Sequence, residues 1–189
     1  MFVRLALAAS ALTLGACASA QGAGHDMSAA DHAAHMMTPV PAPASASTSV
    51  LGMDGSPIGT LSAVQGTKGV LIRVEIEAGG LTEGWHGIHL HAVGDCSDTG
   101  TYKLSGGHEG MMEGGHGLLN PAGPEEGDLP NIWAGADGSA KYEAYSSLFE
   151  LAPALDDDGL ALIIHASPDD HTTQPIGGAG ARVACGAMN

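Results

Sequence analysis

Residues 70–77, "VLIRVEIE", decide the expected fold of this chain. Branched apolar residues occupy every second position from Val70 to Ile76, and mostly charged residues stand between them. A period of two is the pattern of a strand with one face in a core and the other in water. We therefore predict a half-buried β-strand here.

Further short segments with the composition of strands, separated by glycine-rich turns, lie on both sides of this strand. Turn residues cluster at 55–57, 66–69 and 79–80, which is the spacing of hairpins. Glycine contributes 29 of the 189 residues and aromatic residues only 4%, which favours small-residue strands over long helices. We predict one all-β domain, with further strands at 58–65, 83–91, 140–146, 160–165 and 182–186.

The amino terminus has the layout of an export signal. Residues 1–17, "MFVRLALAASALTLGAC", carry one cation at Arg4, then an apolar run, then small residues, and the segment is too short to span a bilayer. Its last four residues resemble a bacterial lipobox, which predicts a signal peptide at 1–16, a lipid anchor at Cys17 and a place in the periplasm or cell envelope. Ordinary cleavage after residues 18–20 is the alternative.

Residues 17–47 are predicted to form a flexible tether, and residues 48–189 the folded domain. The tether is rich in Ala, Ser, Pro and Gly without apolar periodicity. Imidazole and thioether groups suit copper, so it is either a copper-collecting arm or a plain linker. The groups concerned are His25, Met27, His32, His35, Met36 and Met37.

The net charge limits the expected binding partners, and the number of cysteines predicts a covalent link. The formal net charge is −15, and it becomes −16 (−15 − 1) if Arg4 leaves with the signal peptide, which argues against nucleic acid as a partner. With Cys17 lipidated, Cys96 and Cys185 remain, and an even pair in an exported protein predicts a disulfide. Two unrelated buried thiols are the alternative.

Two long segments without a strand pattern, 92–130 and 166–181, are rich in Gly, Pro, Asp and His. Loops of this length in a compact domain are usually functional. Before the first of them, His89 and His91 are two residues apart on an expected strand, so they project from one face about 6.6 Å apart and can reach one metal ion. His86 has the opposite parity and is predicted to be a hydrogen-bonding strut.

Five motifs, in this order, resemble the copper/zinc superoxide dismutase family in its bacterial exported form. They are "GWHGIHLHAVGDC" at 84–96, "SGGH" at 105–108, "HGLLNPAGPEEGDLPN" at 116–131, "IIHASPDD" at 163–170 and "GGAGARVACG" at 177–186. The match covers residue 48 to the end. It implies a flattened, eight-stranded Greek-key barrel, a β-sandwich architecture, with copper outside the barrel wall beneath two long loops.

The resemblance also implies two metal sites that share one histidine. Copper would be held by four neutral imidazoles, those of His89, His91, His108 and His165. Zinc would be held by His108, His116, Asp128 and the residue at position 125. Asp169 would link His89 to His116 behind the metals, Arg182 would be the active-site arginine, and Cys96–Cys185 would be the family disulfide.

Position 125 departs from the family, which has histidine where this chain has Glu125. A carboxylate can bind zinc, so Glu125 can complete the site, or Glu126 can turn in instead, or zinc can bind weakly. Three negative charges around one divalent ion argue mildly against a tight site. The segment 109–115, "EGMMEGG", departs as well, and Met111 and Met112 either cover the barrel or approach copper.

The implied reaction is disproportionation of superoxide to dioxygen and hydrogen peroxide. In the family, His108 would take up and return a proton while Arg182 docks the anion. The alternative is a copper-binding protein that stores or delivers metal on the same fold, and Arg182 argues against it because a store would not need this cation. A purely structural sandwich ranks last. The sequence leaves open whether the domain forms a homodimer.

Overall fold

The computed structural model describes residues 42–189, and strands dominate this range. The expected signal peptide (1–16), the lipidation site Cys17 and the tether up to residue 41 lie outside the described residues. Besides a 3-10 helix η1 (Lys103–Ser105) and a short helix α2 (Leu151–Ala154), the elements are β1 (Ser45–Gly52), β2 (Pro57–Gln65), β3 (Val70–Ile76), β4 (Gly84–His86), β5 (Ile88–His91), β6 (Ile132–Ala134), β7 (Ala140–Ser146), β8 (Leu160–His165) and β9 (Arg182–Met188).

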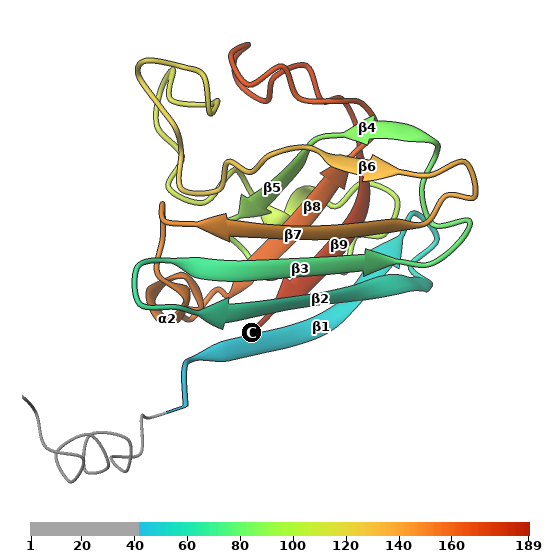
Figure 1. Ribbon diagram of the computed structural model, residues 1–189, viewed down its shortest axis with the longest axis horizontal. Coiled ribbons are helices and arrows are strands. Elements are labelled where there is room, and N and C mark those ends of the chain that lie inside the picture. Colours follow the sequence, from blue (N-terminus) through green and yellow to red (C-terminus); the bar gives the residue numbers. More distant parts are fainter. Residues whose placement is uncertain (1–41) are drawn as a thin grey trace, which may run out of the picture. The chain divides into compact units, whose positions relative to one another are not determined.

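Seven strands form one antiparallel sheet in the order β5-β8-β9-β1-β2-β3-β7. The sheet curls, so that β5, β8 and β9 lie behind β1, β2, β3 and β7 (Figure 1). A second sheet pairs β4 with β6. Because β4 leads into β5 and β6 leads into β7, this pairing links the two ends of the seven-stranded order. The all-β prediction is confirmed.

The predicted strand at 83–91 is divided at Gly87 into β4 and β5, so nine strands stand where eight were expected. Gly87 donates its N–H to Ser167 and accepts a hydrogen bond from the His165 N–H. A side chain there would bring its Cβ to 2.8 Å from the Cβ of Ala179. Contact with the second long loop therefore interrupts the strand.

Strand β3 carries the alternation read from the sequence into the main core. Val70, Ile72, Val74 and Ile76 are buried, while Arg73 and Glu75 are exposed. Strand β8 is buried along its whole length because both of its faces are covered. Its even-numbered residues join the main core, and Ala161 and Ile163 join a small second cluster with Cys96, Tyr102 and Cys185.

Two strands were missed by the sequence analysis. Strand β1 begins at Ser45, inside the segment 17–47 assigned to the tether, and pairs with β2 from Ser45 to Leu51. Its small polar residues resemble a linker, but pairing with a neighbouring strand uses the backbone. Strand β6 has only three residues and lies between a long loop and a tight turn.

The predicted disulfide between Cys96 and Cys185 is confirmed, with the two Cα atoms 5.9 Å apart. It joins the first long loop to β9 across 89 residues of sequence. Closing a loop of this length stabilises a protein by about 4.6 kcal/mol through the unfolded state in the chain-entropy relation. None of the helices within residues 42–189 has the length and apolarity needed to cross a membrane.

Candidate metal centre

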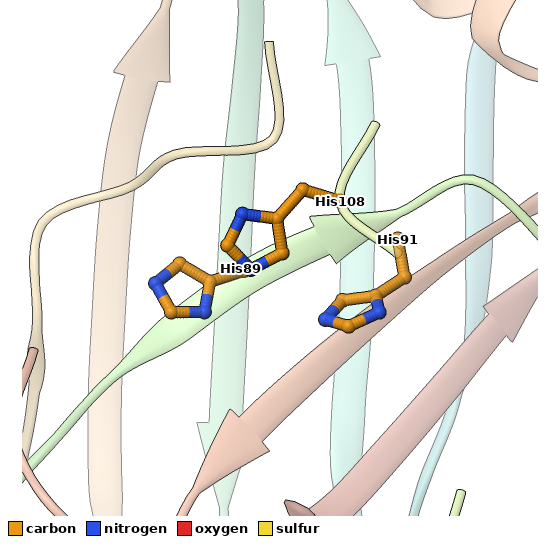
Figure 2. Close-up of side chains that lie close together, drawn as sticks. All are labelled: His89, His91 and His108. Carbon is orange, nitrogen blue, oxygen red and sulfur yellow. The ribbon is translucent and has the colours of Figure 1, made fainter. Parts of the chain in front are cut away.

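Three histidines gather at one end of the barrel wall. His89 and His91 come from β5 and His108 from the first long loop, and their rings face one another in Figure 2. All three are buried, and their metal-binding atoms lie within 4.8 Å of one another. His165, at the end of β8, joins them, with its ring centroid 4.9 Å from that of His89.

Backbone hydrogen bonds attach the first loop to β5 and so place its side chains. The N–H of Leu90 donates to Gly127, and the carbonyl of Leu90 accepts from Glu109, each at 2.9 Å. His91 and His108 face each other in a backbone bridge, as do His89 and Asp128. Position 127 must be glycine, because a Cβ there would lie 2.2 Å from the Leu90 oxygen.

Four imidazoles each present one buried nitrogen that no group in the described residues hydrogen-bonds. These nitrogens are Nδ1 of His89 and Nε2 of His91, His108 and His165. A buried polar atom without a partner is costly. A metal ion held by these nitrogens would remove that cost, so the donor set fits copper, for which imidazole is a suitable ligand.

The opposite ring nitrogens explain why three of these four atoms are free. The Nε2–H of His89 donates to Asp169 at 2.9 Å, and the Nδ1–H groups of His91 and His165 donate to the carbonyls of Gly106 and Gly180 at 3.0 and 3.1 Å. Because each of these partners is an acceptor, the proton sits on that nitrogen and the other keeps its lone pair.

Burial keeps these rings neutral. It lowers the pKa of His89, lowers that of His91 well below its usual range, and lowers that of His165 to about 3. Neighbouring histidines add to the effect at all three, and Arg182 adds to it at His91 and His165. Neutral imidazoles are the form that binds metal.

A second cluster shares His108 and contains His116, Glu125 and Asp128, all buried, with their metal-binding atoms within 4.8 Å of one another. Glu125 Oε2 lies 2.8 Å from His108 Nδ1, and Glu125 Oε1 accepts the Met112 N–H at 3.0 Å. Glu126 is exposed. Of the two glutamates weighed in the sequence analysis, Glu125 is therefore the one that faces this cluster.

The contact between His116 and Asp128 also indicates a cation site. His116 Nδ1 and Asp128 Oδ1 lie 2.8 Å apart, yet neither atom has a hydrogen bond of acceptable direction within residues 42–189. The other oxygen of Asp128 accepts the N–H groups of Gly117 and Glu125, which fixes the carboxylate. Four N and O donors that converge in this way fit a zinc ion.

Asp169 lies behind both clusters and links them. Its two carboxylate oxygens accept hydrogen bonds from His89 Nε2 at 2.9 Å and His116 Nε2 at 3.2 Å. These bonds, together with the His171 N–H, outweigh burial and lower the pKa of Asp169 below its ordinary range. Asp169 is therefore an anion that orients one ring of each cluster.

Asn131 was not singled out from the sequence, although it ends one of the five motifs. Its side-chain amide donates to the backbone carbonyl of Asp169 at 2.8 Å and accepts the Asp169 N–H at 2.9 Å. His171, unassigned in the sequence analysis, lies beside them, with Nδ1 3.3 Å from Asp169. A polar motif residue that follows the expected ligand Asp128 by three positions was the available signal for Asn131.

Arg182 begins β9 and lies beside the four-histidine cluster. Its guanidinium donates to the carbonyls of Tyr102 and Gly106 and to the hydroxyl of Ser105, which is itself 3.4 Å from His91 Nδ1. Arg182 and Lys103 line a surface cavity of about 340 Å³ that also touches Gly180. Ser105 and Tyr102 were not assigned roles from the sequence.

His86 and the two methionines take different places. Both ring nitrogens of His86 face carbonyl oxygens, those of His165 at 2.7 Å and Thr82 at 2.8 Å, so the buried side chain joins the end of β8 to the segment before β4. Met111 and Met112 are exposed. Met112 contributes its backbone N–H, and not its thioether, to the Glu125 carboxylate.

Comparison with known proteins places the chain in one family. The family described as copper/zinc superoxide dismutase (SODC) matches residues 58–188. The superoxide dismutase [Cu-Zn] of Caulobacter vibrioides is 48% identical over 151 residues, which cover 76% of this chain and 85% of that protein. Superoxide dismutase [Cu-Zn] 1 of Aquifex aeolicus is 34% identical over 145 residues, covering 74% and 84%.

Solved structures agree with this assignment. A SOD-like protein from Bacillus subtilis superposes with a TM-score of 0.66 at 30% identity, over 76% of this chain and 97% of that one. The Cu/Zn superoxide dismutase from Brucella abortus superposes with a TM-score of 0.64 at 26% identity, over 77% and 100%. The chain belongs to the copper/zinc superoxide dismutase family.

Proposed function

We propose that the superoxide dismutase activity of this chain resides at the four-histidine cluster. The chain is an oxidoreductase whose metals are copper and zinc. Two superoxide anions and two protons give one dioxygen and one hydrogen peroxide. We assign copper to His89, His91, His108 and His165, and the observation that carries this assignment is their four buried nitrogens, which have no hydrogen-bond partner within residues 42–189. Copper, when bound, supplies one-electron transfer.

The protein must also deliver protons, and His108 is the residue that we assign to this task. Its Nε2 belongs to the four-histidine cluster, while its Nδ1 lies 2.8 Å from Glu125 and 3.5 Å from Asp128. Because one lone pair cannot hold a metal and a proton at once, Nε2 would take a proton only when it releases copper. The ring, held from its Nδ1 side, would then return that proton to the reduced oxygen.

Zinc, in this proposal, is held by His108, His116, Glu125 and Asp128. Support comes from the burial of all four side chains and from the orientation of Glu125 by the Met112 N–H. Asp169 positions one ligand ring of each metal, and His86 holds the backbone of His165 from behind. Glu125 thus takes the place of the histidine expected in the family.

Arg182 docks the substrate in this proposal. Lys103 and Arg182 bring two of the chain's six cations to one cavity against a formal net charge of −15, and a cation in a recess can dominate the local field. Arg182→Ala is expected to lower kcat/KM by roughly tenfold to a hundredfold at low salt, with unchanged copper content. An unchanged rate at low salt would refute the docking role.

The amino-terminal assignments are also part of the proposal. We infer that residues 1–16 are removed as a signal peptide and that Cys17 carries the lipid. We also infer that the tether ends before β1, which begins at Ser45, and that the folded domain works in the periplasm or cell envelope. Their support is the sequence pattern. Mass spectrometry of protein purified from membranes tests them, since a lipid-free amino terminus after residue 20 would exclude the anchor.

A homodimer is the oligomeric state that we propose. Trp85 on β4 and Trp133 on β6 are 53% and 48% exposed and form an edge-to-face pair with ring centroids 5.1 Å apart. Exposed aromatic pairs are common in protein interfaces. Sedimentation tests this proposal: the unaltered protein should be dimeric and the Trp85→Ser variant should dissociate more readily. A monomeric unaltered protein would refute the homodimer.

One assay decides between the enzyme and the metal store. Protein loaded with copper and zinc is analysed for both metals and then assayed for superoxide disproportionation. Activity that rises in proportion to bound copper supports the proposed site. Stoichiometric copper with no activity above that of Arg182→Ala would favour the store.

A further inference from the structure

Arg182 depends on one short stretch for its position. All of its hydrogen-bond partners in the described residues, Tyr102, Ser105 and Gly106, lie within residues 102–106 around η1. A guanidinium has five N–H donors, and these three contacts occupy three of them. The remaining donors are those that can meet an anion. The orientation of Arg182 therefore follows from whatever holds residues 102–106.

Tyr102 is the unusual member of that stretch. Its backbone is left-handed, with φ 50° and ψ 30°, and only His171 shares a positive φ among the non-glycine residues of the described range. For a bulky residue this conformation is strained, and such strain persists only where the surroundings enforce it. The Tyr102 carbonyl accepts hydrogen bonds from both Arg182 and Ser105. The strained residue Tyr102 thus supplies one of the acceptors that hold the Arg182 guanidinium.

The surroundings of Tyr102 supply that constraint. Its phenol donates to the carbonyl of Gly52 at the end of β1, and its N–H donates to Asp98 at 3.0 Å. The ring is fully buried in the small cluster that contains the Cys96–Cys185 disulfide. Burial, with the charges of Asp54 and Asp98, raises the pKa of Tyr102, so the phenol remains a donor at neutral pH.

We propose that Tyr102 is a positioning residue for substrate docking. Its phenol–Gly52 hydrogen bond holds its backbone in the left-handed conformation that presents its carbonyl to Arg182. The role rests on the proposed function, in which Arg182 docks superoxide. It links the first strand of the barrel to the active-site arginine through a residue that touches neither metal nor substrate.

The test removes only the hydroxyl. Tyr102→Phe keeps the buried ring, and Tyr142→Phe is the matched control because its phenol also donates to a backbone carbonyl, that of Pro130 at 3.0 Å. Sodium azide, a small anion with one negative charge, is titrated into each protein loaded with copper and zinc at low salt. Visible absorption of Cu(II) gives its dissociation constant.

We expect Tyr102→Phe to raise the azide dissociation constant about three- to tenfold, the size of one hydrogen bond's net contribution, and Tyr142→Phe to leave it unchanged. Thermal unfolding establishes that both variants are folded, and their copper content and Cu(II) electron paramagnetic resonance spectra should match those of the unaltered protein. Wild-type azide affinity in folded Tyr102→Phe would overturn the proposal.

A double variant identifies the route. If Tyr102 acts through Arg182, then Tyr102→Phe combined with Arg182→Ala binds azide no more weakly than Arg182→Ala alone. The same three- to tenfold loss in the Arg182→Ala background would also overturn the proposal. A wild-type affinity in Arg182→Ala itself would instead refute the proposed docking function, which separates the two failures.

Discussion

The two clusters that share His108 contain different kinds of metal-binding group. The four-histidine cluster presents imidazole nitrogens only, and an acceptor fixes the opposite ring nitrogen of His89, His91 and His165. The other cluster combines two imidazoles with the carboxylates of Glu125 and Asp128. The first suits a metal that changes its charge by one electron, while the second concentrates negative charge for a divalent ion that keeps its charge. In the proposed assignment, one shared ring separates a redox site from an electrostatic one.

The largest expected effect comes from removing a ligand of the four-histidine cluster only. His165→Ala should lose copper and, with it, nearly all dismutase activity, because three imidazoles leave the metal incompletely held. Zinc content should remain, since no hydrogen bond within residues 42–189 joins His165 to a residue of the second cluster. Elemental analysis and the dismutase assay on one preparation measure both. Equal loss of both metals would mean that the two clusters are not separable.

Glu125→Gln should have the opposite effect, with zinc lost and copper retained. Loss of a partner behind a ligand already weakens a metal site by about 10- to 100-fold, so loss of a ligand should lower zinc affinity by on the order of 100-fold. Copper should stay bound, because Glu125 lies on the Nδ1 side of His108.

Two variants serve as controls for that experiment. Glu126→Gln makes the same chemical change at the exposed neighbour and should leave zinc stoichiometry unchanged. Glu125→His restores the residue expected in the family and should retain zinc. Unchanged zinc binding in Glu125→Gln would remove Glu125 from the ligand set.

Asp169→Asn should affect both clusters together. The neutral amide cannot accept two imidazole N–H bonds as well as the carboxylate does, so both His89 and His116 lose orientation. We expect about 10-fold weaker binding of each metal. Competition with a chelator, followed for copper and zinc in parallel, measures the two losses. A loss confined to one metal would contradict the linking role.

Most of the strands could be predicted because burial of one face leaves a period of two, as in β3, and burial of both faces leaves a continuous apolar run, as in β8. Residues 140–146 and 160–165 were placed with the bounds that the structure has, and the strand predicted at 70–77 ends one residue earlier, at Ile76. Strand β1 was missed because its Ser, Ala and Thr residues carry almost no hydrophobic pattern. The break at Gly87 depends on contact with Ala179, which is far away in the sequence.

The residues of the candidate site also fall into those that the sequence could predict and those that it could not. His89 and His91 could be paired by strand parity, and the family motifs supplied the remaining expected ligands. The choice between Glu125 and Glu126 required the loop backbone, since the two residues are neighbours of the same type. The supporting roles of Asn131 and Tyr102 depend on hydrogen bonds to residues 38 and 50 positions away, and no local pattern records them.

The smallest expected effect concerns Asn131, which acts on both clusters from one step further away. Asn131→Ala removes the amide that joins the backbone N–H and carbonyl of Asp169, but it leaves the Asp169 carboxylate in place. Each metal should therefore bind more weakly by only about two- to fivefold, within the range of one or two neutral hydrogen bonds. The chelator competition used for Asp169→Asn measures it. Because the Asn131 amide acts through Asp169, the affinities for copper and for zinc should fall by the same factor. A larger loss of affinity than in Asp169→Asn would mean that Asn131 supports the metal sites by another route.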